Sequence, residues 1–292
     1  MISSMTGYGR GIAESAGRQM TVELKSVNHR YLDLGMRLPR HIGFLEDVFR
    51  TELSAALSRG HVDIFVVYSN LRTDARTVTV DEPLLRAYVT ASREANAHLG
   101  LVDDLTLANA LRLPDVTNII EAEEDREAVA ALAREAIARA VSELKAMRAA
   151  EGERLCADLK LRAGTVLGLT AQIEARAPLV VAEYRVKLED RIAEFLGGVE
   201  VDRARLATEV ALFADRASID EEIVRLKSHV AQMLVSLDSG EPAGRKLDFL
   251  VQEMNREFNT IGSKANDAAL INAVIAGKGE IEKIREQVQN IE

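Results

Sequence analysis

The chain has 292 residues, of which 47% are hydrophobic and 28% are charged, as in an ordinary folded protein. Its single cysteine, Cys156, excludes a disulfide framework and a cysteine-rich zinc site. The net charge of -9 has the wrong sign for a simple electrostatic nucleic-acid binder, although residues 1–60 carry an excess of two positive charges. The sequence shows neither a membrane-spanning apolar run nor a signal-peptide pattern, so we expect a cytoplasmic protein with no membrane partner.

The first 123 residues have the pattern of an α+β domain. Met20, Val22 and Leu24 alternate with polar residues, which predicts a strand with one apolar face. We therefore expect a mixed or antiparallel sheet with helices packed on one face. The same kinds of pattern predict further strands at 31–38 and 61–68, and helices at 44–57, 82–99 and 105–111.

The rest of the chain has helical spacing. Residues 124–195 are rich in Ala, Leu and charged residues and are interrupted by Pro178, which predicts two long helices in a bundle or coiled coil. Residues 197–201 indicate a linker, and loops are expected at 239–242 and around Gly262. The predicted domains are an α+β domain at 1–123, a long-helix region at 124–200 and a helical C-terminal domain at 201–292.

The segment 219–237 predicts an amphipathic helix whose apolar residues form one buried stripe. At about 100° per residue, Glu222, Arg225 and His229 share one flank of this helix, beside its buried edge. A carboxylate, a guanidinium and an imidazole on one flank are candidates for acid–base or metal chemistry. The simpler interpretation is a solvated face with ion pairs between neighbouring turns.

The segment 245–260 predicts a second amphipathic helix. Phe249 on its polar side indicates a surface that a partner subunit or a ligand covers. Lys264 follows in a polar stretch, where Ser263 or Asp267 is expected to cap the last helix. The expected apolar face comprises Leu247, Leu250, Val251, Met254 and Phe258, and the polar face Glu253, Arg256 and Thr260, with Glu257 between the two.

These two helices together offer ligands for a cation. Imidazole mixed with carboxylates suits Mn²⁺, Zn²⁺ or Fe²⁺, whereas carboxylates alone suit Mg²⁺. The spacing nevertheless matches no compact metal motif. The sequence also lacks a phosphate-binding loop, a dinucleotide-binding glycine motif and a nucleophile elbow, so we expect no nucleotide cofactor. The possible ligands are Glu221, Glu222, His229, Glu253, Glu257 and Asp267.

Basic residues account for the positive excess at the N-terminus. Lys25 and the turn at 28–30 are expected to cluster beside Arg37 across a neighbouring strand, where arginines and lysines would bind phosphate. An ordinary solvated sheet face is the alternative. The residues concerned are Arg10, Lys25, Arg30, Arg37, Arg40 and Arg59, with His29, His41 and His61.

Several ordered blocks of the sequence resemble the YicC/YloC family. They cover residues 5–9, 25–32, 59–60, 147–148, 151–152, 225–229, 244–250, 252–257, 259–264 and 284–292, and so extend over essentially the whole chain. The family usually has Ser-Lys-Ser where this chain has Ser263, Lys264 and Ala265, so position 265 offers no hydroxyl.

The resemblance implies an endoribonuclease that acts in RNA degradation, uses a divalent cation (Mn²⁺ or Mg²⁺) and assembles as a homo-oligomer, with a hexamer as the expected form. It does not by itself assign catalytic residues, so we combine it with the helical faces. Arg225, Arg256 and Lys264 would neutralise the scissile phosphate, and Glu222 would be a ligand or the base. The predicted catalytic residues are Glu222, His229, Arg225, Arg256 and Lys264; the metal ligands His229, Glu253, Glu257 and Glu222; and the RNA-binding residues Arg10, Lys25, His29, Arg30, Arg37 and Arg59.

Two other functions are compatible with the sequence. The chain would be a non-catalytic RNA adaptor if its basic face only presents RNA to another ribonuclease, or a helical scaffold if it binds no RNA. Within the nuclease hypothesis, a metal-activated water is one route. Attack by the RNA 2′-hydroxyl with His229 as base is another, and it would leave a 2′,3′-cyclic phosphate.

Overall fold

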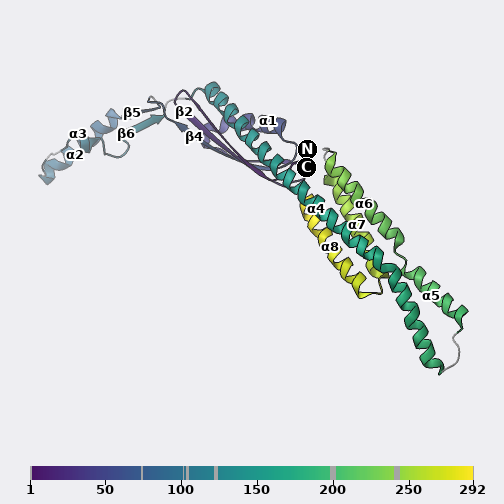
Figure 1. Cartoon of the computed structure of the whole chain (residues 1–292). Helices are drawn as coiled ribbons and strands as arrows, with labels where there is room; N and C mark the ends of the chain where they lie inside the picture. Colours follow the sequence, from purple (N-terminus) through teal and green to yellow (C-terminus); the bar gives the residue numbers. More distant parts are fainter. Residues whose placement is uncertain are drawn as a thin grey trace.

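A computed structural model describes residues 2–73, 75–100, 102, 105–121, 124–197, 202–239 and 244–291. The molecule is long and bent, and its sheet and its helical half follow one another along its length (Figure 1). The two chain ends meet near the middle, between these halves (Figure 1). The predicted α+β fold class is confirmed.

The N-terminal half contains a four-stranded mixed sheet in the order β1-β2-β4-β3. The side chains of Met20, Val22 and Leu24 are fully buried on one face of it, as the alternation predicts. Strands β1 and β2 and strands β2 and β4 pair antiparallel, whereas β3 and β4 are parallel. The strands are β1 (Gly7–Ser15), β2 (Arg18–Val27), β3 (Leu32–Arg37) and β4 (Gly60–Asn70).

Two helices cover the buried face of this sheet, α1 (Glu46–Ala56) and the first part of α4 (Arg126–Leu196). Helix α4 lies so close to β1 that glycine is required there. A Cβ atom added to Gly9 would lie 2.1 Å from the carbonyl oxygen of Ala140, and one added to Gly11 would lie 1.9 Å from that of Ala136. The opposite face of the sheet has no helix packed on it among the described residues.

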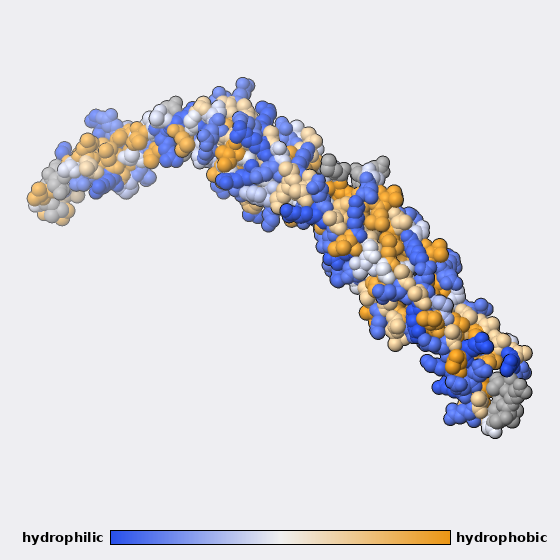
Figure 2. Space-filling model, in the orientation of Figure 1, coloured by the Kyte–Doolittle hydropathy of each residue, from blue (hydrophilic) through white to orange (hydrophobic). Residues whose placement is uncertain are grey.

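A small lobe extends from the far end of the sheet (Figure 1). It holds a hairpin of β5 (Arg76–Val80) and β6 (Thr117–Glu121), with α2 (Glu82–Leu99) and α3 (Leu107–Ala110) between them. The helix expected at 105–111 is thus a single turn, which Thr106 caps. None of the residues of α2 is buried, and apolar side chains are exposed over this lobe (Figure 2).

Helix α4 runs without a break for 71 residues, so the expectation of two helices divided at Pro178 is wrong. Proline inside a helix removes one backbone hydrogen bond. Ile173 and Val180, on either side of it, are buried in the C-terminal core, and this packing holds the helix together. The helix ends at Gly197, whose left-handed backbone (φ 57°) suits glycine.

The second half of α4 packs with α6 (Asp220–Asp238), α7 (Gly244–Lys264) and α8 (Ala268–Val288) as a four-helix bundle, and α5 (Arg203–Ala217) joins it at the far end. The expected loop around Gly262 is wrong, because α7 continues to Lys264. A Cβ on Gly262 would lie 3.2 Å from Val274 of α8, so this glycine serves close helix packing rather than a turn. Most of the predicted linkers at 197–201 and 239–242 lie outside the described residues.

The chain ends pair with each other. Ser4 and Ile291 form an antiparallel bridge, and the backbone amide of Met5 donates to the carbonyl oxygen of Asn290 at 2.9 Å. The Asn28 side-chain amide donates to the carbonyl oxygen of Gln289 at 2.7 Å. The junction therefore connects the sheet directly to the end of the helical bundle. Within the part of the chain that the structure describes, no helix is long and apolar enough to cross a membrane.

Candidate functional site

The seam between α6 and α7 brings together Glu222 and Lys264, two of the predicted catalytic residues. Lys264 Nζ lies 2.8 Å from Glu222 Oε1 and also donates to the carbonyl oxygen of Ser218 at 2.9 Å. Burial opposes ionisation of Glu222, but hydrogen bonds, chiefly that from Lys264, and the positive charges of Lys264 and Arg225 together outweigh it and lower the pKa of this carboxyl. Glu222 is thus a buried, ionised carboxylate that one lysine neutralises.

Arg225 and Glu257 form a second, looser pair across the same seam. Arg225 Nη1 lies 3.9 Å from Glu257 Oε1, and the same guanidinium contacts Glu221 one turn away on α6. The Glu257 side chain is buried, whereas that of Arg225 is mostly exposed. Both buried acids of the predicted ligand set are therefore next to a cation of the protein itself.

The remaining members of the predicted set lie farther along the two helices. Glu253 pairs with Arg256 of its own helix at 3.0 Å. His229 is half-buried, and its Nδ1 is buried without a hydrogen-bond partner. Nowhere among the described residues are three His, Cys, Asp or Glu side chains arranged to hold a metal ion. One chain thus assembles the predicted residues as ion pairs and does not present them as a set of metal ligands.

The stretch after α7 confirms the predicted helix cap. Asp267 Oδ1 accepts the backbone amide of Leu270 at 3.0 Å, at the start of α8. Arg176 of α4 donates to the same carboxylate at 2.7 Å. The hydrogen bond from Arg176, with that from Leu270, lowers the pKa of Asp267 to about 2.

The open face of the sheet holds part of the predicted RNA-binding set. Arg10 of β1, Lys25 of β2 and Arg37 of β3 all belong to the register positions opposite the buried ones. The expected cluster of Lys25 beside Arg37 is wrong, because β4 lies between their strands. Lys25 is paired in register with Asp63 of β4, and Arg37 packs over the Phe65 ring at 5.0 Å.

The turn before β3 carries the other predicted RNA-binding residues. Arg59 Nε donates to the carbonyl oxygen of Arg30 at 3.3 Å, which brings these two arginines together. Arg30 also lies over the ring of Tyr31, 5.2 Å from its centroid, and this ring is 62% exposed. An arginine beside an accessible aromatic ring is a combination that binds phosphate and stacks on bases.

Sequence reasoning placed His61 among the basic residues of the N-terminus and did not predict its contacts with Asp33 and Asp63. His61 Nδ1 lies 2.7 Å from Asp33 Oδ2, and its Nε2 lies 3.5 Å from Asp63 Oδ1. The hydrogen bond with Asp33 is the main reason that the pKa of His61 is raised. Because β3 and β4 are parallel neighbours, residues 28 positions apart meet here. The His29 ring lies next to it, with centroids 6.4 Å apart.

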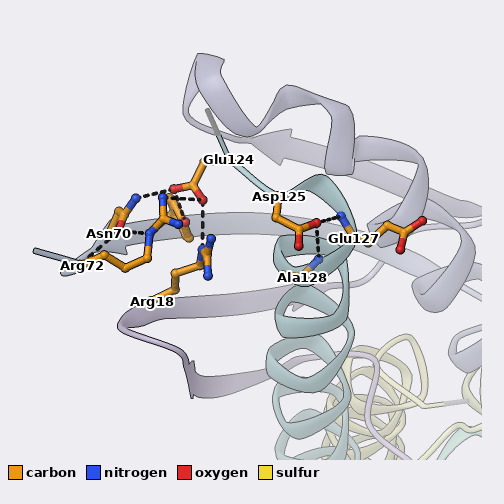
Figure 3. A network of polar contacts seen from close by, with 8 residues as sticks. Arg18, Asn70, Arg72, Glu124, Asp125, Glu127 and Ala128 are labelled. Atoms are coloured by element: carbon orange, nitrogen blue, oxygen red, sulfur yellow. Dashed lines mark hydrogen bonds and ion pairs between the residues drawn. The ribbon is translucent and has the colours of Figure 1, made fainter. Parts of the chain in front are cut away.

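A cavity of about 1120 Å³ opens at the far end of the sheet, and it too was not predicted. Glu124 lies at its wall and accepts hydrogen bonds from Arg18, Tyr68 and Asn70, at 2.9, 2.6 and 2.6 Å (Figure 3). Burial and the hydrogen bond to Glu124 raise the pKa of Tyr68 to about 12. Asp125, next in the chain, caps the start of α4, so this network fixes that helix to the sheet (Figure 3).

Comparison with known proteins places the chain in a family. The family description "Endoribonuclease YicC-like, N-terminal region" matches residues 2–157, and "Endoribonuclease YicC-like, C-terminal" matches residues 173–292. The chain belongs to the YicC-like endoribonuclease family. It is 41% identical to the probable endoribonuclease YicC of Clostridioides difficile and 31% identical to that of Haemophilus influenzae, in both cases over the full length of both proteins.

The YicC-like N-terminal region contains the sheet, with the His61 group and the predicted RNA-binding residues. The YicC-like C-terminal region contains α6 and α7 with their ion pairs. Helix α4 extends from one region into the other. Both candidate sites therefore lie within the matched parts of the chain.

Proposed function

We propose that this protein is an endoribonuclease that cleaves phosphodiester bonds of RNA. The observation that supports this proposal best is the match of both YicC-like regions, together with relatives called probable endoribonucleases that align over their full length. The net charge of -9 requires that local groups of basic residues bind the RNA backbone.

RNA binding is assigned to the open sheet face and the adjoining turn, through Arg10, Lys25, His29, Arg30, Arg37 and Arg59. The contact of the Arg59 side chain with the backbone carbonyl of Arg30 and the exposed Tyr31 ring beside the Arg30 guanidinium support this role. Glu23 and Asp63 lie among these cations, and Glu23 is 3.5 Å from Arg10. We therefore expect weak binding by each chain and a steep loss of binding as salt rises.

A homo-oligomer would combine several such weak surfaces. The apolar side chains on the end lobe support this assembly, since α2 buries none of its residues in one chain. Val78, Ile119 and Leu107 are 62%, 66% and 74% exposed, respectively. Light scattering during gel filtration would give the number of subunits, and we propose a hexamer.

Dependence on a divalent metal ion is a separate part of the proposal. The proposed ligands within one chain are not arranged to hold such an ion. Glu222 is paired with Lys264 and Glu257 lies near Arg225, so the proposed ligands His229, Glu253, Glu257 and Glu222 do not form an open site. A Mn²⁺ or Mg²⁺ ion would need these ion pairs to open or ligands from a second subunit. Binding of Mn²⁺ to the purified protein, measured by calorimetry, tests this.

The activity is tested with protein purified free of other nucleases and a labelled RNA. Cleavage that follows the protein through every purification step supports the proposal. The α6–α7 seam is tested by His229→Ala and Glu222→Gln, each first shown to fold. If these variants cleave like the original protein, the catalytic set Glu222, Arg225, His229, Arg256 and Lys264 is wrong. Binding of RNA without any cleavage would instead favour the adaptor.

A further inference from the structure

The cavity at the far end of the sheet lies where the end lobe joins it. Its walls come from the residues before α1, the end of β4, the start of β5 and the start of α4. Its volume is about 1120 Å³. Pockets for small organic ligands usually measure about 300–1,000 Å³, so this cavity has room for one nucleotide.

Arginines outnumber carboxylates on the walls of the cavity. Arg72, Arg76 and Arg126 line it, and Glu124 is the one carboxylate among the described lining residues. Arg18 already balances the charge of Glu124, because it donates to this carboxylate at 2.9 Å from a side chain that is only 7% exposed. The wall therefore has an excess of positive charge, which favours an anionic group such as a phosphate.

Aromatic rings lie beside these arginines. Arg126 lies over the Phe44 ring, 5.3 Å from its centroid. The ring of His41 lies 5.8 Å from that of Tyr68, and His41 is exposed. All three rings line the cavity. Guanidinium groups bind phosphates, and aromatic and imidazole rings stack on unpaired bases, so this combination favours a nucleotide over a bare anion.

Hydrogen bonds fix the polar part of the wall in place (Figure 3). Asn70 donates to Glu124 at 2.6 Å, and its Oδ1 accepts the backbone amide of Arg72 at 3.1 Å and Nε of Arg72 at 3.2 Å. Tyr68 donates to the same carboxylate at 2.6 Å. A wall that is already ordered lowers the cost of binding a ligand.

The cavity is separate from the open sheet face. Tyr68 and Asn70 occupy the same alternate positions of β4 as the buried Val62 and Ile64, so they belong to the helix-covered face. The turn with the predicted RNA-binding residues adjoins the other end of this strand, at Gly60. At about 3.3 Å per residue, the 11 residues of β4 separate the two places by roughly 33 Å.

We propose that the cavity binds one nucleotide of single-stranded RNA. Arg76 and Arg126 bind its phosphate, and its base stacks on the ring of His41. The bases of a double helix are already stacked on each other, so the cavity favours single strands. The inference rests on the proposed function, to which it adds a binding subsite and no catalytic group. A free nucleotide carries the same phosphate and base, and the experiment separates these two sources.

The phosphate contact is tested with a fluorescein-labelled single-stranded RNA and the full-length protein. Fluorescence anisotropy is measured in EDTA, which prevents metal-dependent cleavage of the probe. Arg76→Gln/Arg126→Gln should raise Kd by about 10-fold, as expected for loss of a charge-assisted phosphate contact. The dependence of log Kd on log salt should become shallower by about 0.7, the value for one phosphate of a single strand. Arg50→Gln/Arg86→Gln removes two exposed arginines of α1 and α2, and this matched control should bind normally.

The base contact has its own readout. His41→Ala should raise the Kd for single-stranded RNA by about 5-fold or more, because stacking of one base contributes at least this much. The salt dependence should stay the same, since a lost stacking contact changes no phosphate contact. An RNA duplex should bind equally to His41→Ala and to the original protein. Adenosine 5′-monophosphate should weaken RNA binding by the original protein, and more effectively than inorganic phosphate does.

Three results would overturn the proposal, with circular dichroism used to establish that each variant folds. The first is normal RNA binding by Arg76→Gln/Arg126→Gln. The second is competition by inorganic phosphate that equals that of the nucleotide, which would remove the base contact. The third is binding of the nucleotide without any effect on RNA binding, which would assign the cavity to a free nucleotide. RNA cleavage by the original protein would persist in all three cases, whereas an original protein that neither binds nor cleaves RNA would also refute the proposed function.

Discussion

Lys264 Nζ, in the last turn of α7, lies 2.8 Å from Glu222 Oε1 in the first turn of α6. The side chain of Glu222 is 10% exposed and that of Lys264 is 34% exposed, so a largely buried carboxylate has its ion pair with a partly exposed lysine. The pair connects two helices that also touch through apolar residues and through the looser Arg225–Glu257 pair.

Lys264→Met should destabilise the protein by about 1–3 kcal/mol, because it leaves the buried Glu222 carboxylate without a cation. In the original protein the pKa of Glu222 is lowered, so its contribution to stability is present above the ordinary value of 4.5 and is lost as pH falls through the lower folded value. Urea unfolding at several pH values measures this. The double variant Glu222→Gln/Lys264→Met should recover part of the lost free energy of unfolding. If Lys264→Met is as stable as the original protein, the prediction is refuted.

Gly11→Ala should destabilise the sheet domain by more than about 1–3 kcal/mol, the usual cost of overpacking, because the added Cβ would meet backbone of α4. Gly164 offers a matched control on the same long helix, since a Cβ there has no neighbour within 4 Å. Gly164→Ala should stabilise by about 0.5–1 kcal/mol through helix propensity. Thermal unfolding compares the two, and equal effects would show that α4 does not lie against β1 as described.

Asp267 should lower the pH at which acid unfolding of the protein begins. Its folded pKa of about 2 lies below the ordinary value of 3.8, so it stabilises the fold above about pH 4 and ceases to do so as pH falls toward 2. Asp267→Asn retains the cap on α8 but loses the charge toward Arg176, so its unfolding midpoint should depend less on pH in that window. Asp267→Ala, which also removes the cap, should have a lower midpoint than Asp267→Asn at neutral pH. Identical acid profiles for Asp267→Asn and the original protein would contradict this.

Tyr68 should keep its proton to an unusually high pH. Its folded pKa of about 12 exceeds the ordinary value of 10. Its contribution to the stability of the fold is therefore complete below pH 10 and is lost between about pH 10 and 12. Tyr68→Phe removes the 2.6 Å hydrogen bond to Glu124 and should cost about 1 kcal/mol. The ultraviolet absorbance of tyrosinate, compared between Tyr68→Phe and the original protein, isolates this titration. A normal titration midpoint for Tyr68 would refute the described network.

The parts of the fold that the sequence predicts are those that depend on neighbours close along the chain. Met20, Val22 and Leu24 point to one face because a strand alternates with a period of two. Ile223 and Leu226 are buried because a helix repeats with a period of 3.6. Asp267 caps α8 through a bond to the amide three residues later, which is equally local.

The errors concern contacts between residues far apart along the chain. Lys25 and Arg37 are separated because β4 inserts between their strands, and no local pattern shows that strand order. Gly262 lies in a polar stretch typical of a turn, yet it is part of helix α7 and allows α8 to approach that helix. The Asp33–His61 contact was missed for the same reason, because it exists only when β3 and β4 pair in parallel.

The sequence predicted that α6 and α7 together offer one set of ligands, and Glu222, Arg225, Glu257 and Lys264 do meet along one seam. His229, Glu253 and Arg256 lie farther along the two helices and do not join it. Which cation would pair with which acid was not predictable. The helical pattern fixes which flank of its helix each residue occupies, but the register between two helices depends on how their cores interlock.

The bridge between Ser4 and Ile291 has a consequence for the newly made chain. The residues before β1 leave the ribosome long before residues 289–291 are made, so the lead into β1 must wait for its pairing partner until that late stretch has been synthesised. A chain that lacked residues 289–291 would leave Met5 without the carbonyl of Asn290 and Asn28 without that of Gln289. Loss of these three residues would thus disturb a segment made nearly three hundred residues earlier.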